Sequence, residues 1–329
     1  MKAIKEVADK AMVSVATVSR VINKSPTVAK ATRDRVLSVI AEMDYQPNLI
    51  GRHLRRSQTK KVLVLIPSIS NQFYSKIITK IETIAQNHGY KTMVCISHSD
   101  RKIELEYIEM LTTKVVDGMI FLTSKLSAKE LSVLAQKYSI VQCSEFVEGS
   151  QTDIVSIDNE KAAFDAVSFL IGKGHRSVAF FGSIEKYNSG ILREKGYRRA
   201  MEENELVIDK NNTFFDGYSY PSGERMAMNL LSLERRPSAI FCISDSIAIG
   251  CIKKLVDCGV RVPEEISVMG FDDTSIAKMY NPAISTVAQP QVEIGELAME
   301  LLVKRMTGDK QPTSFNILPH HLVIRKTTR

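Results

Sequence analysis

The segment from Val15 to Arg20 carries side chains whose chemistry suits binding to a nucleic acid better than a catalytic reaction. Val15 and Ala16 are small and apolar, and such groups can contact a thymine methyl in the major groove. The hydroxyls of Thr17 and Ser19 can bond phosphates, and Arg20 can form a bidentate pair with guanine O6 and N7. On the exposed face of a helix these side chains would read DNA.

Signatures of catalysis are absent from the sequence. We find no G-x-x-x-x-G-K-[ST] loop, no G-x-G-x-x-G after a predicted strand, no H-E-x-x-H and no G-x-S-x-G. The five cysteines are odd in number and include no C-x-x-C pair, so buried thiols are expected rather than disulfides or metal ligands. We therefore expect neither an enzyme nor a bound metal or cofactor.

Two short helices separated by a tight turn would position the DNA-reading side chains. The first helix is indicated by an apolar stripe at i, i+3, i+4 and i+7, formed by Ile4, Val7, Ala8 and Ala11. After the break Met12-Val13-Ser14, Ser14 stands where an N-cap would accept a backbone N–H, so the second helix should begin near Val15. Its inward residues would be Val18, Val21 and Ile22. For these two helices the alternative is an ordinary surface helix hairpin of a larger domain. A third helix is predicted over residues 32–43, capped by Thr32.

Basic charge is concentrated in the first fifth of the chain. Residues 1–61 contain thirteen Lys and Arg against five Asp and Glu, a net charge of +8, whereas the whole chain carries +7, so the remaining residues sum to −1. This asymmetry indicates a polyanionic partner, because each neutralised phosphate releases counterions. A solvated basic tail is the alternative.

A short segment without acidic residues follows this region. Pro47 disfavours helical dihedrals in the residue before it, so the third helix should end there. Residues 49–61 hold five Arg and Lys, too charged and too short a segment to fold alone. Beside DNA it could form a short helix, with Leu54 as an apolar wedge in the minor groove, and we count Arg55 beside it among the DNA contacts. A flexible linker is the alternative interpretation.

These motifs together resemble the headpiece of the lactose/galactose repressor family. The resemblance is carried by Ile4-Lys5-Glu6-Val7-Ala8, Val13-Ser14, Ala16-Thr17-Val18-Ser19-Arg20-Val21-Ile22-Asn23, Ala31-Thr32-Arg33, Arg35-Val36 and Tyr45-Gln46-Pro47-Asn48. It implies that Val15, Ala16 and Arg20 read base edges, and that Leu54 enters the minor groove at the operator centre. It also implies phosphate contacts by four polar residues, Ser14, Thr17, Ser19 and Asn23.

Two positions depart from the family pattern. Met12 stands in the turn where the family often has glycine, and Ala3 stands where a threonine frequently caps the first helix. The missing cap should weaken the first helix by about 1 kcal/mol. Neither change removes a predicted DNA contact.

The remaining residues alternate apolar strand patterns with helical ones. Residues 62–66 form a continuous apolar run, typical of a parallel strand buried on both faces. A helix follows, with Ile77, Ile81, Ile84 and Ala85 on one face and Gly89 just past its end. Further strands are predicted near 92–96, 118–122, 139–143, 177–182, 238–243 and 266–270, and further helices near 101–114, 127–137, 160–172, 189–204, 221–235 and 245–258. Two such sets predict two doubly wound α/β lobes.

The expected fold is therefore a small all-α helix-turn-helix headpiece plus two doubly wound α/β lobes of the periplasmic-binding-protein-like type. We divide the chain into a headpiece at 1–46, a hinge segment at 47–60 and a two-lobe domain at 61–329. The N-lobe is expected to take about residues 61–159 and 290–319, and the C-lobe about 160–289 and 320–329.

The family resemblance extends over both lobes, as in Asp158-Asn159, Gly174-His175, Gly196-Tyr197, Ser244-Asp245, Gly270-Phe271-Asp272-Asp273 and Ala288-Gln289-Pro290. It implies a small-molecule effector in the cleft, where open sheets bind ligands at the carboxyl ends of their strands. The effector contacts it implies are Phe73, Tyr74, Arg193, Tyr218 and Asp272.

These residues also have structural interpretations. Phe73 and Tyr74 could be core aromatics, and Arg193 could be one of several solvated charges. Asp272 could cap the next helix, and for Asp245 we favour capping over ligand contact. Segments such as Glu145-Phe146, Ile157-Asp158-Asn159 and Ala85-Gln86-Asn87-His88-Gly89-Tyr90 look similar to the cytidine-repressor branch, which favours a nucleoside effector, with a sugar as the alternative.

Together these features predict a cytoplasmic transcription regulator, a repressor whose operator affinity is controlled by the effector. A homodimer on a palindromic operator is expected, because two recognition helices would then enter successive major grooves. The chain ends without leucine heptads, which favours a dimer over a tetramer. No 18-residue apolar stretch and no apolar signal core occur, so no membrane partner is expected. The competing class is a two-lobe ligand-binding protein or enzyme without regulatory DNA binding.

Overall fold

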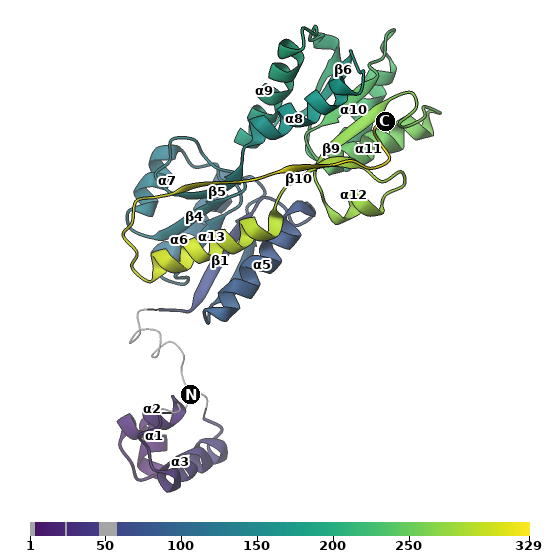
Figure 1. Cartoon of the computed structure of the whole chain (residues 1–329). Coiled ribbons are helices and arrows are strands. Elements are labelled where there is room, and N and C mark those ends of the chain that lie inside the picture. Colours follow the sequence, from purple (N-terminus) through teal and green to yellow (C-terminus); the bar gives the residue numbers. More distant parts are fainter. Residues whose placement is uncertain (1–3, 24, 46–57) are drawn as a thin grey trace. The chain divides into compact units, whose positions relative to one another are not determined.

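The computed structural model describes residues 4–23, 25–45 and 58–329, and the chain separates into two compact units, Met1–Thr59 and Lys60–Arg329. The described part of the first unit contains helices α1 (Ile4–Lys10), α2 (Val15–Ile22) and α3 (Lys30–Glu42) (Figure 1). Their inner faces enclose one small apolar core, formed by Val7, Ala8, Ala11, Val18, Val21, Val36, Val39 and Tyr45. The inward positions predicted on α1 and α2 are thus confirmed: Val7, Ala8, Ala11, Val18 and Val21 are buried, and Ile4 and Ile22 are partly buried against this core.

The start of α3 differs from the prediction. The helix begins at Lys30, its N-cap position is Ala29, and no side chain caps it, so the prediction that Thr32 is the cap is wrong. Thr32 lies inside the first turn of α3 instead. Arg33 supports the preceding loop, because its Nη2 donates to the carbonyl of Ser25 at 2.7 Å. Ala3, Leu54 and Arg55 lie outside the described residues.

Residues 60–329 fold into two lobes, each built on a six-stranded sheet (Figure 1). The N-lobe sheet has the order β11-β5-β4-β3-β1-β2, and all its pairings are parallel. The C-lobe sheet has the order β12-β10-β9-β8-β6-β7, in which only the β10–β12 pair is antiparallel. Their bounds are β1 (Lys61–Ile66), β2 (Lys91–Ile96), β3 (Gly118–Phe121), β4 (Ser139–Cys143), β5 (Asp153–Ile157), β6 (Val178–Ser183), β7 (Thr213–Asp216), β8 (Ala239–Cys242), β9 (Ser267–Asp272), β10 (Ser285–Ala288), β11 (Phe315–Leu318) and β12 (His321–Val323).

Helices cover both faces of each sheet, as expected for doubly wound lobes. The N-lobe carries α5 (Phe73–Asn87), α6 (Arg101–Thr112), α7 (Ala128–Ala135) and α13 (Gln291–Met306). The C-lobe carries α8 (Asn159–Gly172), α9 (Asn188–Glu203), the short 3-10 helix Lys210–Asn212, α10 (Tyr220–Leu231), α11 (Asp245–Asp257) and α12 (Ser275–Met279). Within the C-lobe, the backbones of α10 and α11 approach closely, because Gly223 and Gly250 place no side chain between them.

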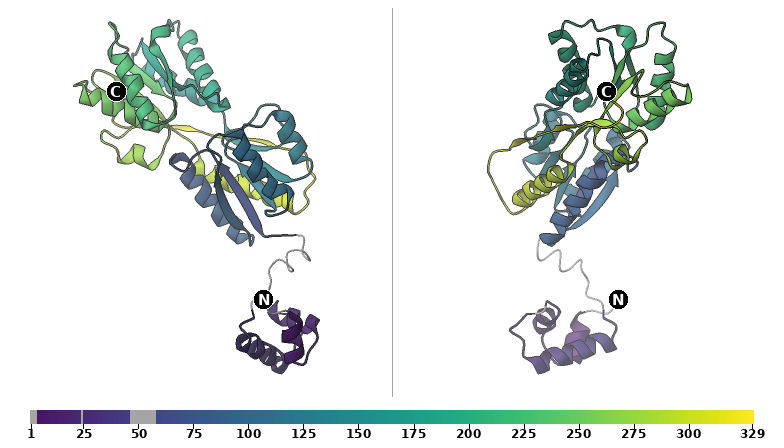
Figure 2. Two further views of the ribbon diagram at one scale, coloured as in Figure 1. Left: turned by 180° about the vertical axis from the view of Figure 1, so that it is seen from behind. Right: turned by 45° about the vertical axis from the view of Figure 1, so that its right-hand side comes forward.

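Between residues 60 and 329 the chain passes from one lobe to the other at three places, after β5, after β10 and after β11. Figure 2 shows the last of these as the yellow segment that runs along both lobes. The strands predicted from apolar runs are confirmed to within two residues. By contrast β5, β7, β10, β11 and β12 were not predicted; β11, for example, alternates between exposed and half-buried residues and so lacks a buried apolar run.

Two further findings concern the described residues as a group. All five cysteines are free, as predicted; three are buried, but Cys258 at the end of α11 is exposed, contrary to the prediction of buried thiols. No described helix combines the length and apolar character needed to span a bilayer.

Candidate functional site

The N-terminus of α2 has the cap that the sequence pattern predicted. The hydroxyl oxygen of Ser14 accepts the backbone N–H of Thr17 at 3.1 Å, and the two hydroxyls are 2.9 Å apart. This bond satisfies one of the free N–H groups of the first turn. The helix therefore begins at Val15, where the predicted DNA-reading side chains begin.

The outward face of α2 presents the side chains singled out in the sequence. Val15, Ala16 and Arg20 are exposed, while Thr17 and Ser19 are half-buried. Nδ2 of the exposed Asn23 donates to the carbonyl of Ser19 at 2.8 Å, which closes the C-terminal turn of the helix. Since Val18 and Val21 are buried beneath, the exposed face stays free of core packing.

Met12 occupies the turn between α1 and α2 in a left-handed conformation, with φ of 52°, and its side chain is 86% exposed. Glycine adopts this conformation without the steric clash that a Cβ introduces. The positive φ of this turn therefore explains why glycine is favoured there.

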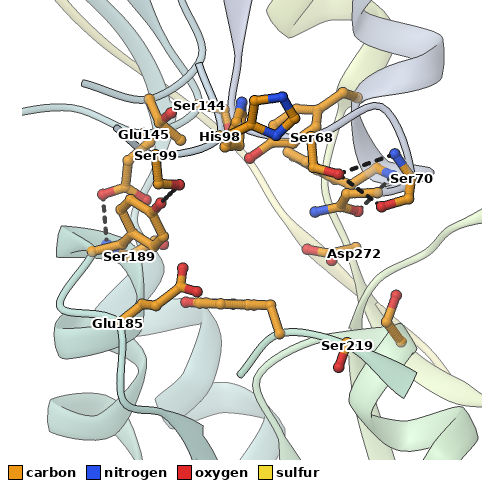
Figure 3. Close-up of a pocket in the computed structure, with 18 of the residues that line it drawn as sticks. Ser68, Ser70, His98, Ser99, Ser144, Glu145, Glu185, Ser189, Ser219 and Asp272 are labelled. Atoms are coloured by element: carbon orange, nitrogen blue, oxygen red, sulfur yellow. Dashed lines mark hydrogen bonds between the residues drawn. The ribbon is translucent and has the colours of Figure 1, made fainter. Parts of the chain in front are cut away.

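A cavity of about 580 Å³ lies between the two lobes (Figure 3). It is lined mostly by segments that follow the carboxyl ends of strands, as expected for open α/β sheets. The N-lobe lining comprises Pro67, Ser68, Ser70, Asn71, Phe73, Tyr74, His98, Ser99, Thr123, Ser144 and Glu145, and the C-lobe lining comprises Glu185, Tyr187, Ser189, Arg193, Tyr218, Ser219, Tyr220, Ser246 and Asp272. All five residues proposed as effector contacts from the sequence line this cavity.

Phe73 and Tyr74 begin α5 and have both of the roles considered for them. They belong to the hydrophobic core, where they are 5% and 9% exposed, and they also line the cavity. Their rings meet edge to face with centroids 5.4 Å apart. Burial raises the pKa of Tyr74 well above its ordinary value, so its hydroxyl stays protonated and can donate a hydrogen bond.

Arg193 is buried in the second turn of α9 and is not a solvated charge. Its Nε donates to Oδ1 of Asn159 at 2.9 Å, and its Nη1 donates to the carbonyl of Ile243 at 2.6 Å. The guanidinium carbon lies 3.6 Å from the ring centroid of Phe271, and Nη1 is 3.7 Å from Oδ1 of Asp272. Among the described residues Nη2 has no hydrogen-bond partner, which leaves two N–H donors for a ligand.

Asp272 ends β9 and points into the cavity (Figure 3). Its Oδ1 accepts Nε2 of Gln289 at 2.8 Å, whereas Oδ2 has no hydrogen-bond partner within the described part of the chain. Burial raises its pKa to about 7, although Arg193 opposes the rise. The φ of 114° at this residue is strained for any residue but glycine. Asp272 does not cap the next helix, because the N-cap position of α12 is Thr274.

Asp245 is fully buried behind Asp272 and does not cap α11, so that prediction is wrong. The cap is Ser244, whose side chain accepts the N–H of Ile247. The carboxylate of Asp245 instead accepts the N–H of Thr274 at 2.7 Å and the hydroxyl of Thr274 at 2.9 Å. It also accepts the hydroxyl of Thr286 at 2.6 Å. These bonds tie the turn after β9 to β10 and thereby support the strained backbone at Asp272.

Tyrosine rings form the C-lobe side of the cavity. The rings of Tyr187 and Tyr218 are 6.0 Å apart, and the ammonium of Lys125 lies 4.3 Å from the centroid of Tyr187. The hydroxyl of Tyr218 is buried; Ser189 is close enough to influence its pKa, but the two side chains form no regular hydrogen bond.

Several cavity residues were not singled out in the sequence. Glu145 and Glu185 follow β4 and β6 by two residues each, so the rule that ligands bind at carboxyl ends of strands would have pointed to them. Two hydrogen bonds here cross the cleft. The hydroxyls of Ser99 and Tyr187 are bonded, and Oε1 of Glu145 accepts the N–H of Ser189 at 3.0 Å.

Nothing in the described residues assembles a metal site: no group of three His, Cys, Asp or Glu side chains is placed to hold an ion. The cavity therefore offers hydrogen bonds, charges and aromatic faces to a ligand.

Both units of the chain match known protein families. Residues 3–48 match the family described as bacterial regulatory proteins, lacI family, and residues 167–328 match the periplasmic binding protein-like domain. Catabolite control protein A of Priestia megaterium is 36% identical over 328 residues, covering 99% of both chains. The HTH-type transcriptional repressor CytR of Escherichia coli K12 is 34% identical over 328 residues, covering 99% of this chain and 96% of that one.

Among solved structures, the lac repressor dimer bound to operator and the anti-inducer ONPF superposes with a TM-score of 0.87 at 25% identity, with 99% of each chain covered. The relatives named here are regulators rather than enzymes. Identity to CytR and to catabolite control protein A is nearly equal, so overall similarity does not single out one branch of the family.

Proposed function

This chain belongs to the lacI family of bacterial regulatory proteins and is a DNA-binding transcriptional regulator, and we propose that it is a cytoplasmic repressor controlled by a small-molecule effector between its lobes. One observation carries the proposal. The same chain presents an exposed, hydroxyl- and arginine-bearing face on α2 and a cavity of about 580 Å³ lined from both lobes. A protein that only bound a ligand would have no use for the first of these.

The DNA contacts come from α2 and the hinge segment. Val15, Ala16 and Arg20 read base edges from the exposed face of the helix. Phosphates are bound by Ser14, Thr17, Ser19 and Asn23, and the minor groove receives Leu54 with Arg55 beside it. Two protomers bind a palindromic operator as a homodimer; the lac repressor has been solved as a dimer bound to operator.

The effector is a sugar or a nucleoside. Arg193 Nη2 offers two donors and Asp272 Oδ2 an acceptor, a combination that suits neighbouring hydroxyl groups. The tyrosine rings offer faces on which a sugar or base can stack. Seven serines along the lining add short hydroxyls that adapt to either ligand.

Coupling between the effector and DNA runs through the closure of the cleft. The Ser99–Tyr187 and Glu145–Ser189 hydrogen bonds join the lobes, so a ligand that strengthens or displaces them changes the angle between the lobes. The spacing of the two hinge segments in a dimer changes with it. The effect on operator affinity is bounded by the ligand's differential affinity, typically about 1 to 3 kcal/mol.

The DNA-binding part is tested by selecting operators from random duplexes with the full chain. Arg20→Ala should weaken binding to the selected operator by roughly 1 to 3 kcal/mol and relax the preference at one base pair. Lys10→Ala removes a headpiece charge that pairs with Glu42, away from the outward face of α2, so it should leave base preference unchanged. Selection of non-palindromic sites, or an unchanged preference in Arg20→Ala, would contradict the assignment.

The effector part is tested by a thermal-shift screen of sugars, nucleosides and purines, since a ligand that binds the folded state raises the melting temperature. Each hit is then titrated into an operator-binding assay. We expect at least one hit to change operator affinity. Hits without such an effect would leave a ligand-binding protein without regulation, contrary to the proposal.

A further inference from the structure

The cavity contains more negative than positive charge. Apart from its tyrosines, its ionisable lining consists of Glu145, Glu185 and Asp272 against Arg193 and the imidazole of His98. Arg193 and Asp272 face each other at 3.7 Å, and neither glutamate has an ion pair of its own, although the charge of Arg193 opposes the rise in the pKa of Glu145. No Lys, Arg or His in the described part of the chain lies within ion-pairing distance of either glutamate.

Lys125, the cation beside Tyr187, is already engaged. The ammonium of Lys125 lies 4.3 Å from the ring centroid of Tyr187, and Lys125 does not line the cavity. The carboxylate of Glu145 is fixed in position, because it accepts the N–H of Ser189 in the first turn of α9 at 3.0 Å. In Figure 3, Glu145 and Glu185 lie on the same side of the cavity as Ser189.

Burial penalises the charged forms of Glu145 and Asp272. It raises the pKa of Glu145, and it raises that of Asp272 to about 7. A ligand cation beside them would favour the ionised forms, whereas an anionic ligand would meet like charges in a poorly solvated space.

Two neutral features of the lining also suit a cation. The faces of Tyr187 and Tyr218 attract positive charge through the ring quadrupole. The hydroxyl of Tyr218 is itself buried, so the ring is the part of this residue that is offered to a ligand.

We propose that the effector carries a protonated amine as well as hydroxyl groups, as an amino sugar or amino nucleoside does, and that its ammonium binds to Glu145 and Glu185. This inference rests on the proposed function, in that the cavity is the effector site. Phosphorylated sugars and nucleotides are excluded by the same charges. Arg193 and Asp272 then bind the hydroxyl groups of the ligand.

The test uses matched ligands with the full chain in phosphate buffer. Glucosamine is compared with glucose, and 3′-amino-3′-deoxyadenosine with adenosine, by thermal shift and calorimetry; glucose 6-phosphate and adenosine 5′-monophosphate are the anionic members. We expect an amine to bind at least roughly tenfold more tightly than its hydroxyl partner, as a charge-assisted hydrogen bond replaces a neutral one. The anionic members should not bind.

Variants locate the ammonium. Glu145→Gln retains an oxygen that can accept the Ser189 N–H, and together with Glu185→Gln it should abolish the preference for amines while leaving the affinity for the neutral partner within a few-fold. Glu148→Gln removes an exposed carboxylate from the same loop outside the cavity and should leave the preference intact.

The outcomes separate this inference from the function on which it rests. If a neutral or anionic ligand binds as well as the amine and changes operator affinity, the ammonium site is wrong and the regulator function stands. If no amine binds, the ammonium site is also wrong. If no ligand of any charge alters operator affinity, the effector function itself is contradicted.

Discussion

Replacing Asp272 by Asn should remove much of the pH dependence of the folded state near neutrality. The pKa of this carboxyl is raised from 3.8 to about 7, chiefly by burial, with Arg193 opposing the rise and Asp245 adding to it. Between these two values the folded protein holds a proton that the unfolded chain has released. The free energy of unfolding is therefore highest below the lower value and falls as pH rises through the upper one.

The size of the effect follows from the shift. About three pKa units correspond to roughly 4 kcal/mol at most. Asp245, whose own pKa is raised to about 6, titrates together with Asp272, so the two share protons and the slopes overlap. We therefore expect the stability lost between about pH 4 and 8 to be smaller in Asp272→Asn than in the parent, by about 2 to 4 kcal/mol.

Asparagine preserves the local geometry. In the parent, Nε2 of Gln289 donates to Oδ1 of Asp272 at 2.8 Å, and the Oδ1 of asparagine can accept the same bond and face Arg193. The Nδ2 of asparagine then takes the place of Oδ2, which has no hydrogen bond in the described residues. The assay is urea unfolding followed by far-ultraviolet circular dichroism at a series of pH values. Glu185→Gln is the control, because it removes a carboxylate from the exposed mouth of the same cavity. An Asp272→Asn slope equal to that of the parent would refute the reasoning.

Three further changes test other parts of the structure. Gly250→Ala would place a Cβ 2.0 Å from a carbonyl oxygen of α10, so it should destabilise the C-lobe by at least about 2 kcal/mol in urea unfolding. The control is Gly172→Ala, whose Cβ would meet nothing within 4 Å and should not destabilise the lobe. Equal effects of the two substitutions would contradict the packing argument. Met12→Gly relieves a left-handed residue at the expense of backbone entropy, with an expected net gain of about 0.5 to 1 kcal/mol seen as slower amide exchange in α1 and α2; faster exchange would count against it. Tyr187→Phe and Ser99→Ala each remove the same hydrogen bond across the cleft, so each should lower the free energy of unfolding by about 0.5 to 1.5 kcal/mol. The double variant should lose no more than either single variant, and additive losses would mean that the two hydroxyls do not share a bond.

Local patterns were sufficient for most of the fold. The apolar stripes of α1 and α2, the cap at Ser14 and the buried runs of the central strands act over a few residues, so periodicity and turn chemistry reveal them. Edge strands such as β11 have no such pattern, because their residues are stabilised by a neighbouring strand and alternate between half-buried and exposed positions. The cap of α3 was misplaced for a related reason, since no side chain caps that helix.

Sequence patterns were enough to show that this chain joins a basic helix-turn-helix headpiece to two α/β lobes, and they identified residues that line the interlobe cavity. The contacts of those residues depend on the packing of distant segments. Arg193 is buried because Asn159, the carbonyl of Ile243 and the ring of Phe271, all distant in sequence, surround its guanidinium. The excess of carboxylates in the cavity likewise arises where loops from two separate sheets meet. Local spacing specifies elements, but the charge of a cavity is set by which distant segments enclose it.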